Sequence, residues 1–187
     1  MKIISVVYFD SSYNDFHNIH FVWRKNMLIR LAKIEDLKEL LEIYNYAIKN
    51  LTATFDLVEQ NLEERKPWFD SHRGKYPLLV AEVDGEIAGY CSLSSFKDKQ
   101  AYEKTGELSI YLSPRFFGRG IGKALMKEII QKARELNYHS IISVITDGNE
   151  ISVKLHEKFG FKHVGCLKEA GYKFDKWIDV HYYQLIL

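Results

Sequence analysis

The spacing of apolar side chains along the chain predicts the helices. Residues 35–49 and 121–137 each carry a stripe of apolar positions three or four residues apart, as an amphipathic helix does. A shorter helix is expected in NEISVKLHEKFG, where Asn149 fits as the N-cap and Gly160 as the residue that ends it. A fourth helix over LEERKPWFDSH is expected to start near Val58 and to cross Pro67.

Runs of β-branched and aromatic residues predict the strands. PLLVAEVDGEIAGYCSLSSF holds two strands joined by Asp84-Gly85, a strong hairpin signal. GELSIYLSP gives a strand closed by Pro114, and SIISVIT gives an apolar strand expected inside the sheet. The tail predicts two antiparallel strands, and a first strand is expected near Met27. The order β-α-α-β-β-β-α-β-α-β-β predicts an α/β (α+β) fold, a mixed sheet with helices on both faces.

The pattern changes near Met27. The apolar run MKIISVVYF is followed by no small-residue cleavage site, so we do not expect a signal peptide. We expect residues 1–26 to be an N-terminal appendage and residues 27–187 to form one domain. A flexible arm, an added strand and an upstream extension of the reading frame remain open for the appendage.

Composition narrows the class of protein. The 187 residues are 47% hydrophobic and 27% charged, which is typical of one globular domain. A net charge of +1 predicts neither a nucleic-acid nor a membrane partner, and no apolar stretch reaches the ~18 residues of a membrane span. Cys91 and Cys166 lack metal-type spacing. We expect no metal site, and both thiols to be reduced and at least half-buried in a cytoplasmic protein.

The segment SPRFFGRGIGKALM places glycines between a strand and a helix, where backbone N–H groups can hold a phosphate. A P-loop would need Ser or Thr after Gly122-Lys123, but Ala124 stands there. A dinucleotide-binding turn would need G-x-G-x-x-G in the first βα unit and an acidic residue about 20 positions on. The spacing here is G-x-G-x-G, and Asp147 lies too far along. A turn without a ligand remains open.

Several motifs together resemble a known family. FFGRGIG, ELSIYLSP and NEISVKLHEKFGF resemble the acyl-CoA-binding core of the GNAT superfamily of N-acetyltransferases. Longer segments, including TATFD and GYKFDKWIDVHYYQL, resemble its phosphinothricin and methionine sulfoximine acetyltransferase group from Met27 to the C-terminus. Phe117 departs from the family's Gln or Arg, so Arg119 or Arg115 would supply the charge at the pyrophosphate.

The resemblance implies a GNAT-like sheet with a splayed strand pair that binds acetyl-CoA. Main-chain groups of Ile110, Tyr111 and Leu112 would bind the pantetheine arm, and Asn149, supported by Ser152, would hold it from the far side. Loop amides would wrap the pyrophosphate, with no room for a Cβ at the central glycine. These loop residues are Phe117, Gly118, Arg119, Gly120, Ile121, Gly122 and Lys123.

Two residues match the family's catalytic positions. Glu107 would accept a proton from the amine, directly or through a water; an exposed glutamate at a strand start is the alternative. His156 stands where many relatives carry the tyrosine that protonates the leaving sulfur, and a packing role is equally open.

The same group acts on amino acids whose side chains mimic a tetrahedral anion. The implied acceptor is thus a small amine of the phosphinothricin, methionine sulfone or methionine sulfoximine type. Candidate contacts are Lys97, where relatives often carry arginine, and Phe55, Arg73, Phe96, Tyr102 and Lys173. We expect a homodimer with Trp177 and Asp179 near the subunit contact. Three alternatives stay open: a non-catalytic acyl-CoA sensor, an enzyme that acetylates a protein N-terminus, and a nucleotide-dependent enzyme.

Overall fold

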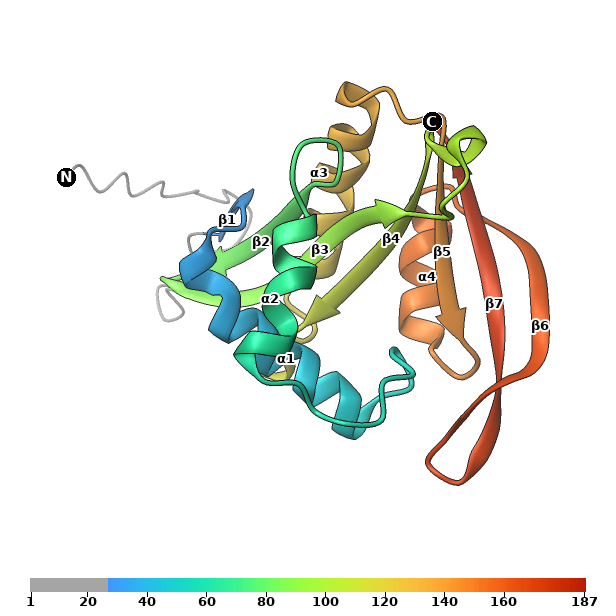
Figure 1. The fold of residues 1–187 in the computed structure, drawn as a ribbon, viewed down its shortest axis with the longest axis horizontal. Coiled ribbons are helices and arrows are strands. Elements are labelled where there is room, and N and C mark those ends of the chain that lie inside the picture. The colour runs from blue at the N-terminus through green and yellow to red at the C-terminus, as the bar shows by residue number, and fades with distance from the viewer. Residues whose placement is uncertain (1–26) are drawn as a thin grey trace, which may run out of the picture.

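The computed structural model describes residues 27–187, which form one seven-stranded mixed sheet (Figure 1). Residues 1–26, where the sequence predicts an appendage, lie outside the described residues. The strand order is β1-β2-β3-β4-β5-β7-β6. The strands are β1 (Met27–Leu31), β2 (Leu78–Val83), β3 (Glu86–Ser95), β4 (Thr105–Leu112), β5 (Ser140–Thr146), β6 (Lys162–Lys173) and β7 (Lys176–Ile186). The helices are α1 (Leu37–Asn50), α2 (Leu62–Ser71), α3 (Ile121–Glu135) and α4 (Glu150–Lys158). The predicted order of elements is confirmed.

Helices cover both faces of the sheet, as the sequence predicts. In Figure 1, α1 and α2 lie in front of the sheet and α3 behind it. Strand β2 shows why, because its side chains alternate between two cores. Leu78 and Val80 are buried in the core that contains Leu40 of α1, whereas Leu79 is buried in the core that contains Leu125 of α3. Within residues 27–187, no helix has the length and apolar character needed to cross a membrane.

Local signals explain most element ends. Asp84 and Gly85 have φ of 53° and 86°, the left-handed pair that a type I′ turn between β2 and β3 requires. The predicted start of α2 near Val58 is wrong, because the helix begins at Leu62. Asn61 Oδ1 accepts the Glu64 N–H at 3.0 Å, and the Glu64 carboxylate accepts the Asn61 N–H at 2.8 Å. This reciprocal cap fixes the helix start.

The other predicted helices lie close to their observed bounds. The helix predicted over residues 121–137 ends at Glu135, and the one predicted over residues 35–49 begins at Leu37 after a short 3₁₀ turn. Gly160 has a φ of +91° after α4, as predicted for the residue that ends this helix. Pro67 lies inside α2, where it removes one backbone donor.

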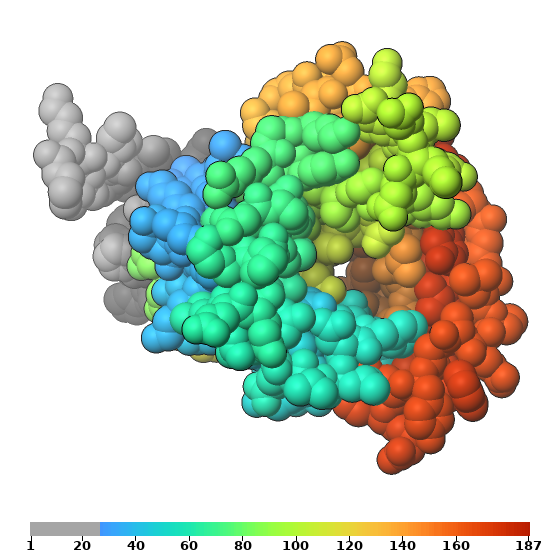
Figure 2. Space-filling view, in the orientation of Figure 1, coloured from blue at the N-terminus to red at the C-terminus, as the bar shows by residue number. Residues whose placement is uncertain are grey.

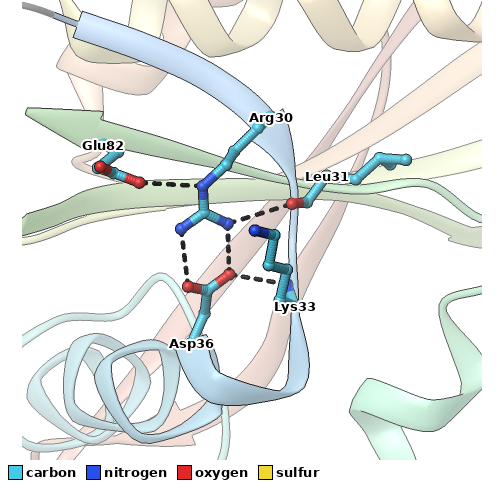
Figure 3. A network of polar contacts seen from close by, with 5 residues as sticks. All are labelled: Arg30, Leu31, Lys33, Asp36 and Glu82. Atoms are coloured by element: carbon cyan, nitrogen blue, oxygen red, sulfur yellow. Dashed lines mark hydrogen bonds and ion pairs between the residues drawn. The ribbon is translucent and has the colours of Figure 1, made fainter. Parts of the chain in front are cut away.

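Edge strand β1 is held by an ion-pair network (Figure 3). The Arg30 guanidinium donates to both carboxylate oxygens of Asp36, at 2.7 and 2.8 Å, and its Nε donates to Glu82 at 2.9 Å. Asp36 also accepts the Lys33 N–H at 2.7 Å. Burial acts to raise the pKa of Asp36, but the hydrogen bonds from Arg30 and Lys33 outweigh it, so this pKa lies below its ordinary value. The network ties β1 to both β2 and the start of α1.

We expect Arg30→Met to lower the free energy of unfolding by about 2–3 kcal/mol, because it leaves the buried Asp36 carboxylate without its cation. Urea unfolding would measure the loss. Lys75→Met, which breaks the exposed pair with Glu103, is the control and should cost much less, because water and salt screen that pair. Because the folded pKa of Asp36 is depressed, its contribution is present at neutral pH and is lost as pH falls below about 4. Equal losses in the two variants would contradict this account.

Candidate active site

Strands β4 and β5 separate along their length. They pair in parallel from Thr105–Ser140 to Leu108–Ser143, and there the pairing stops. β4 continues to Leu112 and β5 continues to Thr146. A gap therefore opens inside the sheet, and the predicted splayed strand pair is confirmed.

The register of β4 decides which backbone groups face this gap. The Ser113 N–H donates to the Ala88 carbonyl at 2.9 Å, so the backbone groups of Ser113 point toward β3. In an antiparallel ladder this direction alternates from one residue to the next. The backbone groups of Ile110 and Leu112 therefore point into the gap, whereas those of Tyr111 point toward β3. Of the three residues predicted to bind through their main chains, two have the required direction.

Tyr111 contributes through its side chain instead. Its hydroxyl donates to the Ala53 carbonyl at 3.1 Å, and its ring packs 5.4 Å from the rings of both Tyr44 and Tyr90. Burial raises its pKa, so the phenol stays protonated and remains a donor. Tyr111 thereby attaches β4 to the segment that follows α1.

This bridging segment, residues 52–56, is attached to three strands on the α1 and α2 side of the gap. Besides the bond from Tyr111 of β4, the Thr52 hydroxyl lies 2.9 Å from the Thr146 hydroxyl at the end of β5. The Lys173 ammonium of β6 donates to the Thr54 carbonyl at 2.8 Å. Figure 2 shows a hollow on this face, next to the segment after α1 and the red hairpin of β6 and β7. The bridging segment thus forms one wall of the hollow.

The glycine loop lies between β4 and α3. Gly118 and Gly120 have φ of +75° and +79°, and nothing lies within 4 Å of a Cβ built on either residue. The expectation that a Cβ here leaves no room concerns the bound pyrophosphate and stays a prediction; within the protein, the constraint on Gly120 is its left-handed backbone. The first helical hydrogen bond runs from the Ala124 N–H to the Gly120 carbonyl. The N–H groups of residues 121–123 precede it and are open to an anion.

Two arginines flank this loop. The Arg115 guanidinium lies 2.7 Å from the Glu86 carboxylate in an exposed ion pair. The Arg119 guanidinium lies 5.1 Å from the Phe116 ring, and it has no carboxylate partner within residues 27–187. Phe117 is half-exposed at the start of the loop. Of the two predicted cations, Arg119 is therefore the better placed to bind a pyrophosphate.

Glu107 lies on β4, one residue before the last pair with β5. Its side chain shares a face of the sheet with that of Tyr111, because the two are four residues apart on one strand. Within the described part of the chain, its carboxylate has no hydrogen-bond or ion-pair partner. Burial raises its pKa above the ordinary value of 4.5. A half-buried carboxylate without a cation is suited to accept a proton.

His156 lies on α4, on the opposite face of the sheet, and is 2% exposed. Its Nδ1 lies 2.7 Å from the Ser152 carbonyl, and its ring packs edge-on against Phe161. Burial lowers its pKa, so the imidazole is neutral at neutral pH. Since a carbonyl only accepts hydrogen bonds, Nδ1 carries the proton and Nε2 has none to donate.

The start of α4 has the predicted cap. Asn149 Oδ1 accepts the Ser152 N–H at 3.2 Å, which leaves the amide NH₂ of Asn149 available beside the gap. The Ser152 hydroxyl lies 3.3 Å from His156 Nδ1, so Ser152 is engaged within the helix.

The candidate acceptor contacts fall into separate groups. Phe96, Lys97 and Tyr102 form one cluster: the Lys97 ammonium lies 5.2 Å from the Phe96 ring and 5.6 Å from the Tyr102 ring. Phe55 belongs to the bridging segment, and its ring lies against Gly171 of β6. Lys173 bonds to the same segment, is 3% exposed, and has its pKa lowered by burial.

Arg73 is not brought together with these residues. Its guanidinium lies 3.1 Å from the Asp70 carboxylate of α2. It lines a separate cavity with Lys132 and Glu135 at the end of α3, and none of the other acceptor candidates lines that cavity. Sequence reasoning missed Thr52 and Thr146, which close the gap; the polar residues of TATFD were the only signal.

A strand pair that separates inside a mixed sheet, a glycine loop opening onto a helix N-terminus and a nearby half-buried carboxylate define an N-acetyltransferase. The chain belongs to the GNAT acetyltransferase family, because the family model for the acetyltransferase (GNAT) domain matches residues 29–182.

Relatives of known activity match nearly the whole described chain. The L-methionine sulfoximine/L-methionine sulfone acetyltransferase of Pseudomonas aeruginosa is 36% identical over 161 residues, which are 85% of this chain and 94% of the relative. The phosphinothricin N-acetyltransferase of Streptomyces coelicolor is 38% identical over 160 residues, which are 83% of this chain and 94% of the relative. The crystal structure of a GNAT phosphinothricin acetyltransferase from Sinorhizobium meliloti in complex with AcCoA is 34% identical. Its TM-score is 0.83, with 86% of this chain and 88% of that chain covered.

Proposed function

We propose that this protein transfers the acetyl group of acetyl-CoA to the amine of a small amino acid. The side chain of that amino acid ends in a tetrahedral, oxygen-bearing phosphorus or sulfur, as in phosphinothricin, methionine sulfone or methionine sulfoximine. The observation that carries the proposal is the gap between β4 and β5, with the directed backbone of Ile110 and Leu112 on one edge and Glu107 beside it. The activities of the two named relatives support the acceptor class.

Different residues bind the coenzyme and transfer the proton. The glycine loop and Arg119 bind the pyrophosphate, and Ile110, Leu112 and Asn149 hold the pantetheine arm. Glu107 takes a proton from the substrate ammonium, directly or through a water, so that the amine nitrogen can attack the thioester carbonyl. The C–N bond forms as the C–S bond breaks, and CoA leaves as its thiolate. The nitrogen loses its second proton as the amide forms. Since neutral His156 supplies no proton from Nε2, this second proton passes through water to the CoA thiolate.

One candidate cation lies beside the hollow. Lys173 carries a buried ammonium next to Thr54, whereas Lys97 belongs to the separate cluster with Phe96 and Tyr102, at the opposite end of the sheet. We propose that Lys173 binds an anionic group of the acceptor, either its α-carboxylate or the oxygens of the tetrahedral group. A lysine acts as a point charge and lacks the paired geometry of arginine.

A panel of amines tests the acceptor class. The full chain is incubated with acetyl-CoA and a thiol indicator, with phosphinothricin, methionine sulfone, methionine sulfoximine, methionine and a peptide with N-terminal alanine as acceptors. We expect the first three to have the highest kcat/KM. Turnover of the peptide alone would overturn the acceptor class, and coenzyme binding without any turnover would indicate a sensor.

We expect Gly171→Ala to raise the KM for the amine and to leave the KM for acetyl-CoA unchanged. A Cβ at this position would lie 2.2 Å from the Phe55 ring, so the ring must move into the hollow or out to solvent. Gly165→Ala in the same strand is the control, because nothing lies within 4 Å of its Cβ. An unchanged amine KM would remove Phe55 from the acceptor site.

A further inference from the structure

A group of metal-binding side chains lies on the C-terminal hairpin of β6 and β7, outside the residues assigned to acetyl transfer. Cys166, Asp179 and His181 each offer one ligand atom, and these atoms lie within 4.8 Å of one another. All three residues are half-buried. Within residues 27–187 they form the one group of at least three such side chains.

The register of the hairpin holds these side chains on one face. Cys166 and His181 are direct cross-strand partners, and Asp179 lies two residues from His181 on the same side of β7. The Cys166 sulfur lies 3.9 Å from His181 Nε2. Asp147 follows the end of β5, and one of its carboxylate oxygens lies 3.8 Å from the same Nε2 of His181. Asp147 lies outside the group of three but next to His181, which makes it a potential fourth ligand.

These separations suit a tetrahedral ion. Zinc bonds of about 2.0–2.3 Å place neighbouring ligand atoms roughly 3.3–3.8 Å apart. The two measured separations from His181 Nε2 need to change by only a few tenths of an ångström. Asp147 is 72% exposed, so its side chain can rotate toward the ion without disturbing packing.

A second histidine supports the orientation of the first. His163 Nε2 lies 3.1 Å from His181 Nδ1. If Nε2 of His181 binds a metal, its Nδ1 carries the proton and donates it to His163. An outer hydrogen-bond partner of this kind fixes the tautomer and the ring plane of a metal-binding histidine.

We propose that Cys166, Asp179 and His181 bind a zinc ion, with Asp147 as the fourth ligand and His163 as the outer partner of His181. A thiolate and an imidazole favour zinc over magnesium or calcium, which prefer oxygen ligands alone. Binding releases the thiol proton of Cys166. The sequence alone predicts no metal, because Cys166 and His181 are 15 residues apart, which matches no local spacing motif; only the strand register brings them together.

The neighbouring Lys168 ammonium competes with a metal ion for Asp179. The Lys168 ammonium lies 2.6 Å from one oxygen of Asp179, and the Glu169 N–H donates to the other oxygen at 2.9 Å. Each carboxylate oxygen retains a lone pair for a metal. Lys168 is 76% exposed and can move away, but its charge competes for the same carboxylate. Removing it should therefore strengthen metal binding.

Cobalt(II) is the probe, because it replaces zinc in tetrahedral sites and its bond to a thiolate gives a charge-transfer band in the near ultraviolet. We expect the full chain, stripped with a chelator, to bind one equivalent of Co²⁺ with this band and to lose the band on addition of one equivalent of Zn²⁺. Cys166→Ser should abolish the band. Cys91→Ala, which removes the buried thiol of β3, should leave it unchanged.

Calorimetry with zinc separates the roles of the ligands and the lysine. We expect Asp179→Asn to weaken binding at least tenfold, and Lys168→Met to strengthen it several-fold. The double variant Cys166→Ser/His181→Gln, checked for folding by circular dichroism, should bind no zinc at the hairpin. Absence of the cobalt band in the unchanged protein, or equal zinc affinity in the double variant, would overturn the proposal.

Discussion

Glu107→Gln should lower kcat by roughly 10²–10⁴-fold, the range that a positioned general base contributes, while the Kd for acetyl-CoA stays within about twofold. The amide keeps the shape of the side chain but cannot accept the proton of the substrate ammonium. Steady-state kinetics and calorimetry with CoA would measure the two effects separately. Glu103→Gln is the control, because Glu103 is exposed, lies at the entry to β4 and pairs with the exposed Lys75. Unchanged turnover in Glu107→Gln would remove this carboxylate from the mechanism.

The pH dependence gives an independent reading of Glu107. Since burial raises its pKa, the rise in rate as the carboxylate ionises should lie above the ordinary carboxyl range, and Glu107→Gln should lack this limb. Ionisation of Glu107 should raise the rate but lower the stability of the fold. A raised folded pKa means that stability is lost as pH rises through that pKa, so the amide variant should unfold at an equal or higher Tm at neutral pH. A lower Tm would instead indicate a structural role.

Gly120→Val should raise the Kd for acetyl-CoA at least tenfold. A β-branched residue at a φ of +79° costs about 1–2 kcal/mol, which the loop can relieve only by turning its N–H groups away from the pyrophosphate. Titration with CoA would measure the change. Gly74→Val is the matched control, because Gly74 has a φ of +60° and equally open surroundings but lies after α2. It should lower the Tm similarly and leave the Kd unchanged. Normal coenzyme binding by Gly120→Val would mean that the loop is only a turn.

The sequence predicts the elements that depend on short-range signals. Apolar periodicity locates the helices, and Asp84-Gly85 locates the hairpin, because each signal lies within the element it specifies. The predicted start of α2 is too early, because the sequence before Asn61 is compatible with either a helix or a loop. Only the reciprocal cap between Asn61 and Glu64 separates the two.

The site is less predictable because it depends on register and on distant contacts. The direction of the Tyr111 backbone follows from the hydrogen bond between Ser113 and Ala88, which sets the register of β4 against β3. The sequence of β4 alone does not specify this register. The position of Arg73 depends on where α2 ends relative to α3. Resemblance to a family supplies residue roles, but pairing of strands decides which of those residues meet.

The three bonds that hold the bridging segment have a consequence for how such an enzyme can diversify. In the proposed mechanism the acceptor binds beside this segment, whereas the thioester donor is held by a glycine turn and a helix end elsewhere. We therefore expect changes in the bridging segment to alter which amine is accepted without weakening the binding of the nucleotide portion of the donor.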